Sequence, residues 1–234
     1  MTQTSKRYID LVYGPALRTP EAIAVVCGQE RLTFSQVHKR AGCLGAAFRS
    51  LGLVAGDRVA LLADNELQYL EIQAACLRSG FTLVPLNARL TGPELEYIIG
   101  DCTPALFIGG KNYAETVLRI GGKCDIDRLY STAENSVVGS YQALLDSAIP
   151  DPDADPTDNE LNTLILYTSG TTGHPKGATI DRMAFSARVM GNAMEMEIGQ
   201  DEVLLQNLPL FHISAFLLYA YFFRGARCVL LSLI

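Results

Sequence analysis

The sequence predicts an α/β fold, in which layered and mostly parallel sheets are flanked by helices. Short apolar runs alternate with segments of helical periodicity over residues 33–109, and Gly or Pro stands at most of the junctions. The composition agrees, because 49% of the 234 residues are hydrophobic and 19% are charged. A chain of this length and composition can bury a sizeable core, which excludes disorder for the chain as a whole.

The first predicted helix begins at Thr33 and ends before Gly52. Thr33 is a typical N-cap residue, and Gly52 is a typical helix stop. Apolar residues recur between them at spacings of three and four: Phe34, Val37, Ala41, Leu44, Phe48 and Leu51. This spacing gives the helix one apolar face, and the apolar residues 57–63 that follow predict a buried strand.

The alternation continues with a second helix from Asn65 to about Gly80 and a short strand at residues 82–84, stopped by Pro85. Pro93 marks the first turn of a third helix, and residues 105–108 form another apolar strand. Residues 111–147 predict a helix, a short strand and another helix. Strands that alternate with helices indicate a parallel sheet with helices packed on it.

An acidic, proline-rich segment at residues 150–160 has two interpretations, a surface loop within one domain or a domain boundary. We treat residues 1–234 as one domain, with a first α/β subdomain over about residues 1–150. A second subdomain then starts at about residue 160, with a strand at residues 161–167. The apolar run 213–223 predicts a buried helix, since it is too short to span a bilayer.

Charge and cysteine content exclude several classes of protein. The net charge is −6 and no basic patch stands out, so nucleic-acid binding is not expected. Residues 1–10 contain no apolar signal-peptide core, and a cytoplasmic protein without a transmembrane segment is expected. The six cysteines are scattered singly, which favours reduced, mostly buried thiols over disulfides and shows no zinc pattern.

The segment T-S-G-T-T-G-H-P-K-G, residues 168–177, carries the clearest chemical signal. Glycines let the backbone approach a ligand closely, hydroxyls and exposed N–H groups donate hydrogen bonds, and Lys176 supplies positive charge for phosphate. The alternative is a plain connecting loop. The segment is neither a P-loop nor a dinucleotide fingerprint, because the chain contains no G-x-x-x-x-G-K-[ST] and no G-x-G-x-x-G.

With Tyr167 before it, this segment resembles the phosphate-loop signature of the adenylate-forming superfamily. That group includes acyl-CoA and aryl-CoA synthetases, firefly-type luciferases and the adenylation domains of peptide synthetases. The segment L-P-L-F-H-I-S-A, residues 208–215, resembles the family's motif near the acyl pocket. Upstream, L-T-F-S-Q-V, G-D-R-V-A-L-L and V-P-L-N-A-R-L-T are also similar to the first subdomain of that family.

The resemblance implies the N-terminal part of the adenylate-forming enzyme fold and a two-step reaction. A small-molecule carboxylic acid attacks the α-phosphorus of ATP to give an acyl-adenylate and pyrophosphate, and a thiol, usually of CoA, then takes the acyl group. Mg²⁺ and fixed hydrogen-bond donors are the expected catalysts. The residues that would hold the β- and γ-phosphates are Thr168, Ser169, Gly170, Thr171, Thr172, Gly173 and Lys176, with Thr168 as a candidate Mg²⁺ contact.

The resemblance places His212 beside the acyl pocket and the thiol channel, where it would orient the carboxylate or gate the thiol. A satisfied core histidine is the alternative from the residues alone. Amino-acid-activating relatives carry an Asp in this segment, whereas P-L-F-H-I-S-A-F-L-L has no acid, so a fatty or aromatic acid is favoured. Four further residues are pocket or plain core candidates: Met190, Met194, Met196 and Phe216.

The later segments of the family pattern are absent, including Y-G-x-T-E, T-G-D and the mobile C-terminal domain with its lysine. We therefore expect the chain to be a truncated N-terminal AMP-binding domain, inactive alone, from a longer acyl-CoA synthetase. The first alternative is a non-catalytic ATP- or partner-binding fragment of that family. The second is an unrelated Rossmann-like nucleotide binder.

Overall fold

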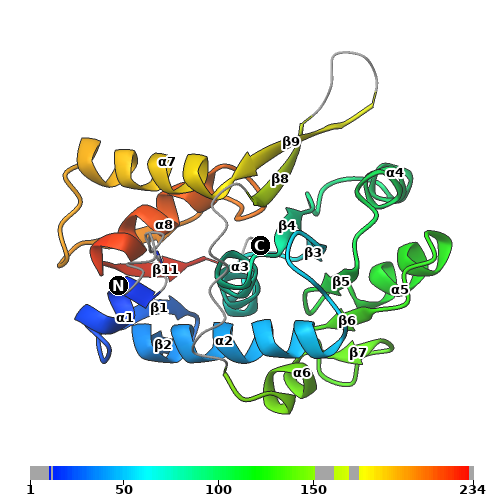
Figure 1. Ribbon diagram of the computed structural model, residues 1–234, viewed down its shortest axis with the longest axis horizontal. Coiled ribbons are helices and arrows are strands. Elements are labelled where there is room, and N and C mark those ends of the chain that lie inside the picture. Colours follow the sequence, from blue (N-terminus) through cyan, green and yellow to red (C-terminus); the bar gives the residue numbers. More distant parts are fainter. Residues whose placement is uncertain (1–10, 12, 151–160, 169–173, 232–234) are drawn as a thin grey trace, which may run out of the picture.

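The computed structural model describes residues 11, 13–150, 161–168 and 174–231. Helices and strands alternate along most of this length (Figure 1). The helices are α1 (Tyr13–Arg18), α2 (Phe34–Ser50), α3 (Leu67–Ser79), α4 (Gly92–Cys102), α5 (Ala114–Lys123), α6 (Tyr141–Ser147), α7 (Arg182–Glu195) and α8 (Ser214–Arg224). The strands are β1 (Ile23–Cys27), β2 (Glu30–Thr33), β3 (Arg58–Leu62), β4 (Thr82–Pro85), β5 (Leu106–Gly109), β6 (Leu129–Ser131), β7 (Gly139–Ser140), β8 (Asn162–Thr168), β9 (Lys176–Asp181), β10 (Val203–Gln206) and β11 (Arg227–Leu230).

The larger sheet has seven strands in the order β7-β6-β5-β3-β4-β8-β9. All neighbours are parallel except β8 and β9, which confirms the predicted mostly parallel sheet. Val59 and Leu61 of β3 pack with the helices α2 and α3, whereas Ala60 and Leu62 pack with α4 and α5. Side chains on a strand alternate between faces, so helices cover both faces of this sheet.

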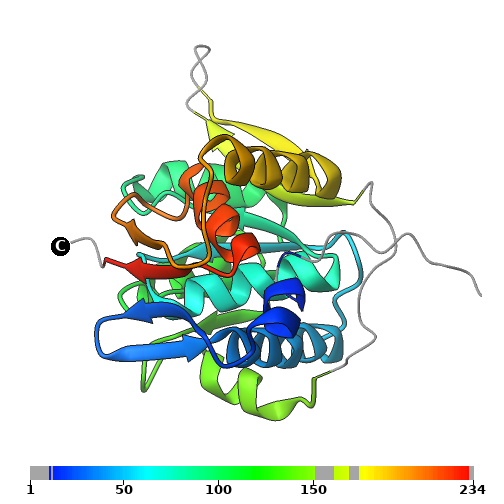
Figure 2. The ribbon, with the colours of Figure 1, turned by 90° about the vertical axis from the view of Figure 1, so that its left-hand side faces the viewer.

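The smaller sheet has four strands in the order β10-β11-β1-β2. Its centre joins distant parts of the chain, because Val25 of β1 pairs in parallel with Cys228 of β11. Figure 2 shows this sheet beside α3, with α7 and α8 on one side and α2 on the other. The sequence interpretation named no element before Thr33, so the β1–β2 hairpin was missed.

Both sheets take strands from both sides of residue 150, since β4 pairs with β8 and β1 pairs with β11. The proposed division into two subdomains stays a prediction. The region 111–147 contains the expected helix, strand and helix, together with the short additional strand β7.

Helix ends follow the predicted capping signals. Thr33 caps α2 with a full capping box to Gln36, Pro93 lies in the first turn of α4, and Gly80 ends α3 in the left-handed conformation. The helix predicted from Asn65 begins at Leu67 instead. Glu66 is its N-cap and has an extended backbone, and the Asn65 side chain is hydrogen-bonded to the distant segment at residues 208–210.

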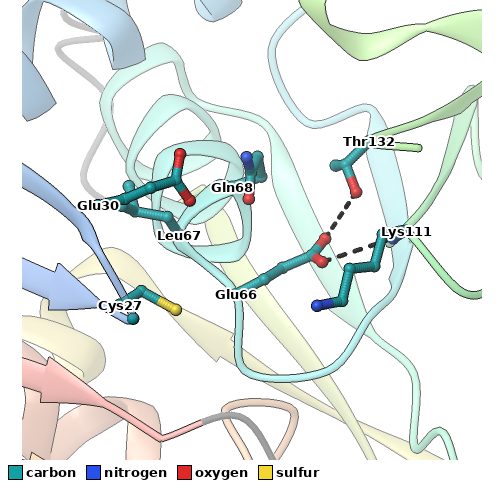
Figure 3. Close-up of a pocket in the computed structure, with 8 residues that line it drawn as sticks. Cys27, Glu30, Glu66, Leu67, Gln68, Lys111 and Thr132 are labelled. Atoms are coloured by element: carbon teal, nitrogen blue, oxygen red, sulfur yellow. Dashed lines mark hydrogen bonds between the residues drawn. The ribbon is translucent and has the colours of Figure 1, made fainter. Parts of the chain in front are cut away.

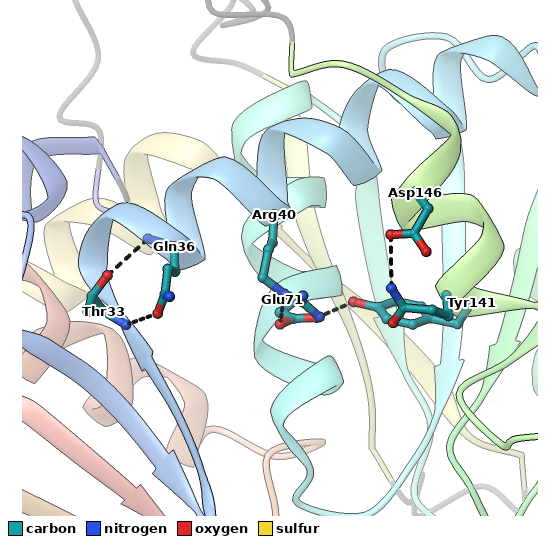
Figure 4. A network of polar contacts seen from close by, with 7 residues as sticks. Thr33, Gln36, Arg40, Glu71, Tyr141 and Asp146 are labelled. Atoms are coloured by element: carbon teal, nitrogen blue, oxygen red, sulfur yellow. Dashed lines mark hydrogen bonds and ion pairs between the residues drawn. The ribbon is translucent and has the colours of Figure 1, made fainter.

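A buried polar network joins three helices behind the larger sheet (Figure 4). Glu71 of α3 is fully buried and accepts hydrogen bonds from Arg40 of α2 and from the hydroxyl of Tyr141 on α6. The Arg40 Nη2 to Glu71 Oε2 distance is 3.1 Å. Burial of Tyr141 and the neighbouring Glu71 carboxylate together raise the pKa of the Tyr141 hydroxyl well above its ordinary value.

The remaining sequence expectations concern thiols and membrane spans. All six cysteines lie in the described part of the chain as free thiols, and four of them are buried: Cys43, Cys76, Cys102 and Cys228. Within the same part of the chain, no helix has the length and apolar character needed to cross a bilayer.

Candidate functional site

The phosphate-loop motif lies at the turn of the β8–β9 hairpin. Thr168 is the last residue of β8 and Lys176 the first of β9, and the two are directly paired across the hairpin. Directly paired residues of antiparallel strands project on the same face, so the Thr168 and Lys176 side chains lie on one face of the hairpin. Both residues are exposed. The other predicted phosphate contacts, Ser169, Gly170, Thr171, Thr172 and Gly173, lie outside the described residues.

The glycine that closes the motif has a packing role. Gly177 pairs with Tyr167, and a Cβ at Gly177 would lie 2.8 Å from Cγ2 of Ile165 and 3.1 Å from Cζ of Tyr167. A side chain at this position would therefore push the Tyr167 ring away from the strand. Gly177 lets the two strands stay in contact next to Lys176.

Helix α4 contacts strand β8 and His174, which lies just before β9. The Tyr167 hydroxyl donates a hydrogen bond to Asp101, and the Tyr97 ring stacks on the His174 ring at a centroid distance of 4.8 Å. Tyr97 and Asp101 are four residues apart on α4 and so share one face of the helix. Sequence reasoning missed both residues, because nothing in a helical pattern shows which strand the helix will contact.

A cleft of about 520 Å³ lies beside the His212 segment. His212 lines it and is exposed, so it is not a core histidine of the described structure. The cleft takes residues from three parts of the chain: Asn87, Arg89, Arg188, Asn192, Met196, Leu208, Pro209, Phe211, His212, Ile213, Ser214 and Leu217. This volume is in the range of small-molecule sites, which is about 300–1,000 Å³.

Four residues were candidates for either this pocket or plain core, and the structure separates two of them. Met196 lines the cleft. Phe216 is buried against Phe185 with ring centroids 4.8 Å apart, so it belongs to the core. Met194 is exposed and Met190 half-buried, and neither is among the residues that line the cleft.

The cleft and the hairpin share one edge of the larger sheet. β4 and β8 are parallel neighbours, so Asn87 and Arg89, which follow β4, lie at the same edge as Thr168 at the end of β8. Ligands of parallel sheets typically bind at this carboxyl edge. Among the described residues, the lining includes the cationic side chains of Arg89 and Arg188 but no carboxylate. This charge distribution suits an anionic ligand.

A smaller hollow of about 250 Å³ lies at the ends of β3, β5 and β6, closed by the β1–β2 turn (Figure 3). Its central group is the buried Glu66 carboxylate, which accepts hydrogen bonds from the Thr132 hydroxyl at 2.8 Å and the Lys111 backbone N–H at 3.4 Å. Burial raises the pKa of Glu66, although these two hydrogen bonds partly oppose the rise. Each carboxylate oxygen thus has a partner within the protein, which indicates a structural role.

The raised pKa of Glu66 predicts a pH effect on stability. Because the folded state holds this proton more tightly than the unfolded chain, the contribution of Glu66 is greatest below the ordinary pKa of 4.5 and is lost as pH rises. We expect Glu66→Gln to flatten this part of the pH dependence, so its stability relative to the parent rises from pH 4 toward pH 7. Urea unfolding midpoints of the variant and the parent, compared across this pH range, measure the change in relative stability.

Glu30→Gln is the matched control for this prediction, because Glu30 lines the same hollow but is exposed. Its midpoint difference from the parent should stay nearly constant with pH. Parallel pH profiles for the Glu66 variant and the parent would contradict a raised pKa of Glu66 in the folded state.

Comparison with known proteins decides the family. The family model described as AMP-binding enzyme matches residues 15–233, which is nearly the whole chain. The chain belongs to the AMP-binding enzyme family. The sequence resemblance and the fold that it implied are thereby confirmed.

Two curated relatives of this AMP-binding family member have names that describe the joining of an acid to CoA. Feruloyl-CoA synthase from an Amycolatopsis species is 34% identical over 200 residues, which cover 86% of this chain and 38% of that protein. Indoleacetate–CoA ligase from Aromatoleum aromaticum is 32% identical over 200 residues, which cover 83% and 39%. The chain thus spans well under half the length of the curated relatives that it matches.

Solved structures extend the likeness to the fold. The inhibitor-bound N-terminal domain of FACL13 from Mycobacterium tuberculosis superposes with a TM-score of 0.87 at 27% identity, covering 97% of this chain and 58% of that one. The anthranilate CoA ligase AuaEII in complex with anthranoyl-AMP gives 0.91 at 20% identity, covering 100% and 46%. Because its identity is only 20%, the likeness to AuaEII supports the fold alone.

Proposed function

We propose that this chain is the phosphate- and acid-binding front part of an acid–thiol ligase of the acyl-CoA synthetase kind. The reaction is ATP-dependent activation of a fatty or aromatic carboxylic acid to an acyl-adenylate, followed by transfer to CoA. The observation that carries the proposal is the shared sheet edge. The Thr168–Lys176 pair lies at the same edge as a cleft that is lined by His212 and, within the described part of the chain, by no carboxylate.

In the first step, a carboxylate oxygen forms a bond to the α-phosphorus of ATP, and pyrophosphate leaves with the electron pair of the broken P–O bond. Lys176 and the Thr168 hydroxyl would hold the phosphates in line and stabilise their negative charge. His212 would orient the acid at the cleft. In the second step the thiol sulfur bonds to the acyl carbon, and AMP leaves.

The described residues could hold Mg²⁺ only together with bound phosphates. In the part of the chain that the structure describes, no three His, Cys, Asp or Glu side chains gather as a metal site. Thr168 offers one hydroxyl oxygen, and Mg²⁺ commonly takes its other ligands from phosphate and water. When bound with ATP, Mg²⁺ would neutralise phosphate charge.

The class of acid follows from the cleft. An amino acid would bring an ammonium group next to Arg89 and Arg188 with no carboxylate in the lining to pair with it. The apolar lining residues, such as Leu208, Phe211 and Leu217, suit an aliphatic or aromatic body. The names of two curated relatives, a feruloyl-CoA synthase and an indoleacetate–CoA ligase, support the same class.

Acid-dependent formation of pyrophosphate tests this proposal. The natural gene product that carries this chain is incubated with ATP, Mg²⁺, CoA and one of three acids: a long-chain fatty acid, a hydroxycinnamic acid or an amino acid. We expect turnover with a fatty or aromatic acid, little with the amino acid, and none for the 234-residue chain alone. Turnover restricted to the amino acid, or its absence with every acid, would overturn the proposal.

A further inference from the structure

Asn65 forms a buried link between the two sheets at the cleft. It lies between β3 and α3 and is 1% exposed. Its Nδ2 donates a hydrogen bond to the Leu208 carbonyl at 3.0 Å, and its Oδ1 accepts one from the Leu210 N–H at 2.8 Å. One side-chain amide therefore binds two backbone groups of a segment more than 140 residues away.

The segment that Asn65 binds has little regular structure of its own. Residues 207–213 connect β10 to α8, and Pro209 at their centre lacks a backbone N–H. Leu210 is buried, so its N–H needs a partner, and Asn65 supplies one. Gln206 adds a hydrogen bond to the Leu208 carbonyl at 2.7 Å, and the Ser214 hydroxyl adds one to the Pro209 carbonyl at 2.5 Å.

We propose that Asn65 is a positioning residue for the acid cleft, holding the Leu208–Leu210 turn so that His212 faces the bound acid. The proposal rests on the function proposed above, since it assigns the cleft to the acid. Leu208, Pro209 and His212 all line the cleft, so a shift of this turn would change its shape directly. The neighbours of the Thr168–Lys176 pair, Tyr167 and His174, make separate contacts with Asp101 and Tyr97 of α4. Loss of Asn65 should therefore affect the acid more than ATP.

The first test uses the 234-residue chain and needs no substrate. We expect Asn65→Ala to speed hydrogen exchange of the Leu210 amide about tenfold or more, as for loss of a hydrogen bond to a buried donor. The ring signals of His212, assigned with His212→Gln, should shift in the NMR spectrum. Asn207→Ala is the matched control, because Asn207 is exposed in the same segment.

A second variant keeps the test decisive if Asn65→Ala fails to fold. Asn65→Asp retains an acceptor for the Leu210 N–H and loses the donor to Leu208. We expect it to preserve slow exchange at Leu210 while the His212 signals still shift. If the foldable variant matches Asn207→Ala in both measurements, Asn65 does not position the turn.

The functional measurement uses the natural gene product. Asn65→Asp should raise KM for the acid about tenfold or more while KM for ATP changes little, as expected when a cleft wall moves and the phosphate contacts stay. An equal rise in both values would overturn the positioning role. If the unmodified product shows no acid-dependent pyrophosphate at all, the proposed function fails, and the exchange and NMR results still decide whether Asn65 positions His212.

Discussion

Replacing Glu71 with Ala is expected to lower the free energy of unfolding by about 3–5 kcal/mol, the cost typical of breaking a buried ion pair. Glu71 is fully buried, whereas its partner Arg40 keeps 30% of its side chain exposed. The substitution leaves the Arg40 guanidinium and the Tyr141 hydroxyl without their shared acceptor, and it removes packing volume between α2, α3 and α6. Urea denaturation of the 234-residue chain measures the loss.

The exposed ion pair between Lys123 and Glu96 provides a control. Their separation is 2.7 Å, but the Lys123 side chain is 57% exposed, so solvent screens the pair. We expect Glu96→Ala to cost less than about 1 kcal/mol, as for surface ion pairs in general. Similar costs for Glu71→Ala and Glu96→Ala would contradict the assignment of the buried network as a main contributor to stability.

A combined replacement distinguishes the loss of a partner from the loss of the network. Replacing Arg40 with Met, Glu71 with Leu and Tyr141 with Phe removes every member together. Buried ionic groups that are replaced together by apolar residues of similar volume often leave stability unchanged. The combined variant should therefore be more stable than Glu71→Ala alone, because no polar group is left buried without its partner.

The elements that could be predicted from the sequence are those with local signals. Thr33, Gly80 and Pro93 act on the backbone within one helical turn, so a few neighbouring residues were enough to predict each helix end. β1 was missed although its five apolar residues, I-A-V-V-C, resemble the apolar runs at residues 57–63 and 105–108 that predicted strands. The parallel partner of β1 is β11, about 200 residues away, which no local pattern can indicate.

The residues of the candidate site also differ in whether a local sequence signal indicates them. Lys176, Thr168 and His212 could be named as candidates because two contiguous motifs carry them, and their roles stay predictions. The structure places the first two on an exposed hairpin and His212 in the lining of the cleft. Asp101, Tyr97 and Asn65 were not found, because each acts through a contact between distant elements. The Asn65–Leu210 hydrogen bond, for example, spans 145 positions. Their roles depend on how α4 and β3 pack, which follows from the whole core.

Replacing Lys176 with Ala should produce the largest loss of activity in this part of the site. Removing one preorganised group that stabilises transition-state charge typically costs on the order of a hundredfold in rate. Lys176 is exposed at the start of β9 and supports no core packing, so the loss should appear in acid-dependent pyrophosphate formation and not in stability. The assay uses the natural gene product at saturating and subsaturating ATP.

Three variants make this result specific to the charge at position 176. Lys39→Ala removes an exposed lysine from α2 and should leave the rate unchanged. Lys176→Arg keeps the charge and should retain more activity than Lys176→Ala. Combining Lys176→Ala with Thr172→Ala should lower the rate further, and a loss of less than tenfold in this double variant would rule out the assigned phosphate role. A small loss would indicate that Lys176 is only an exposed surface lysine. Such a residue makes no contact that strengthens as negative charge develops on the phosphates, whereas a phosphate-binding lysine does.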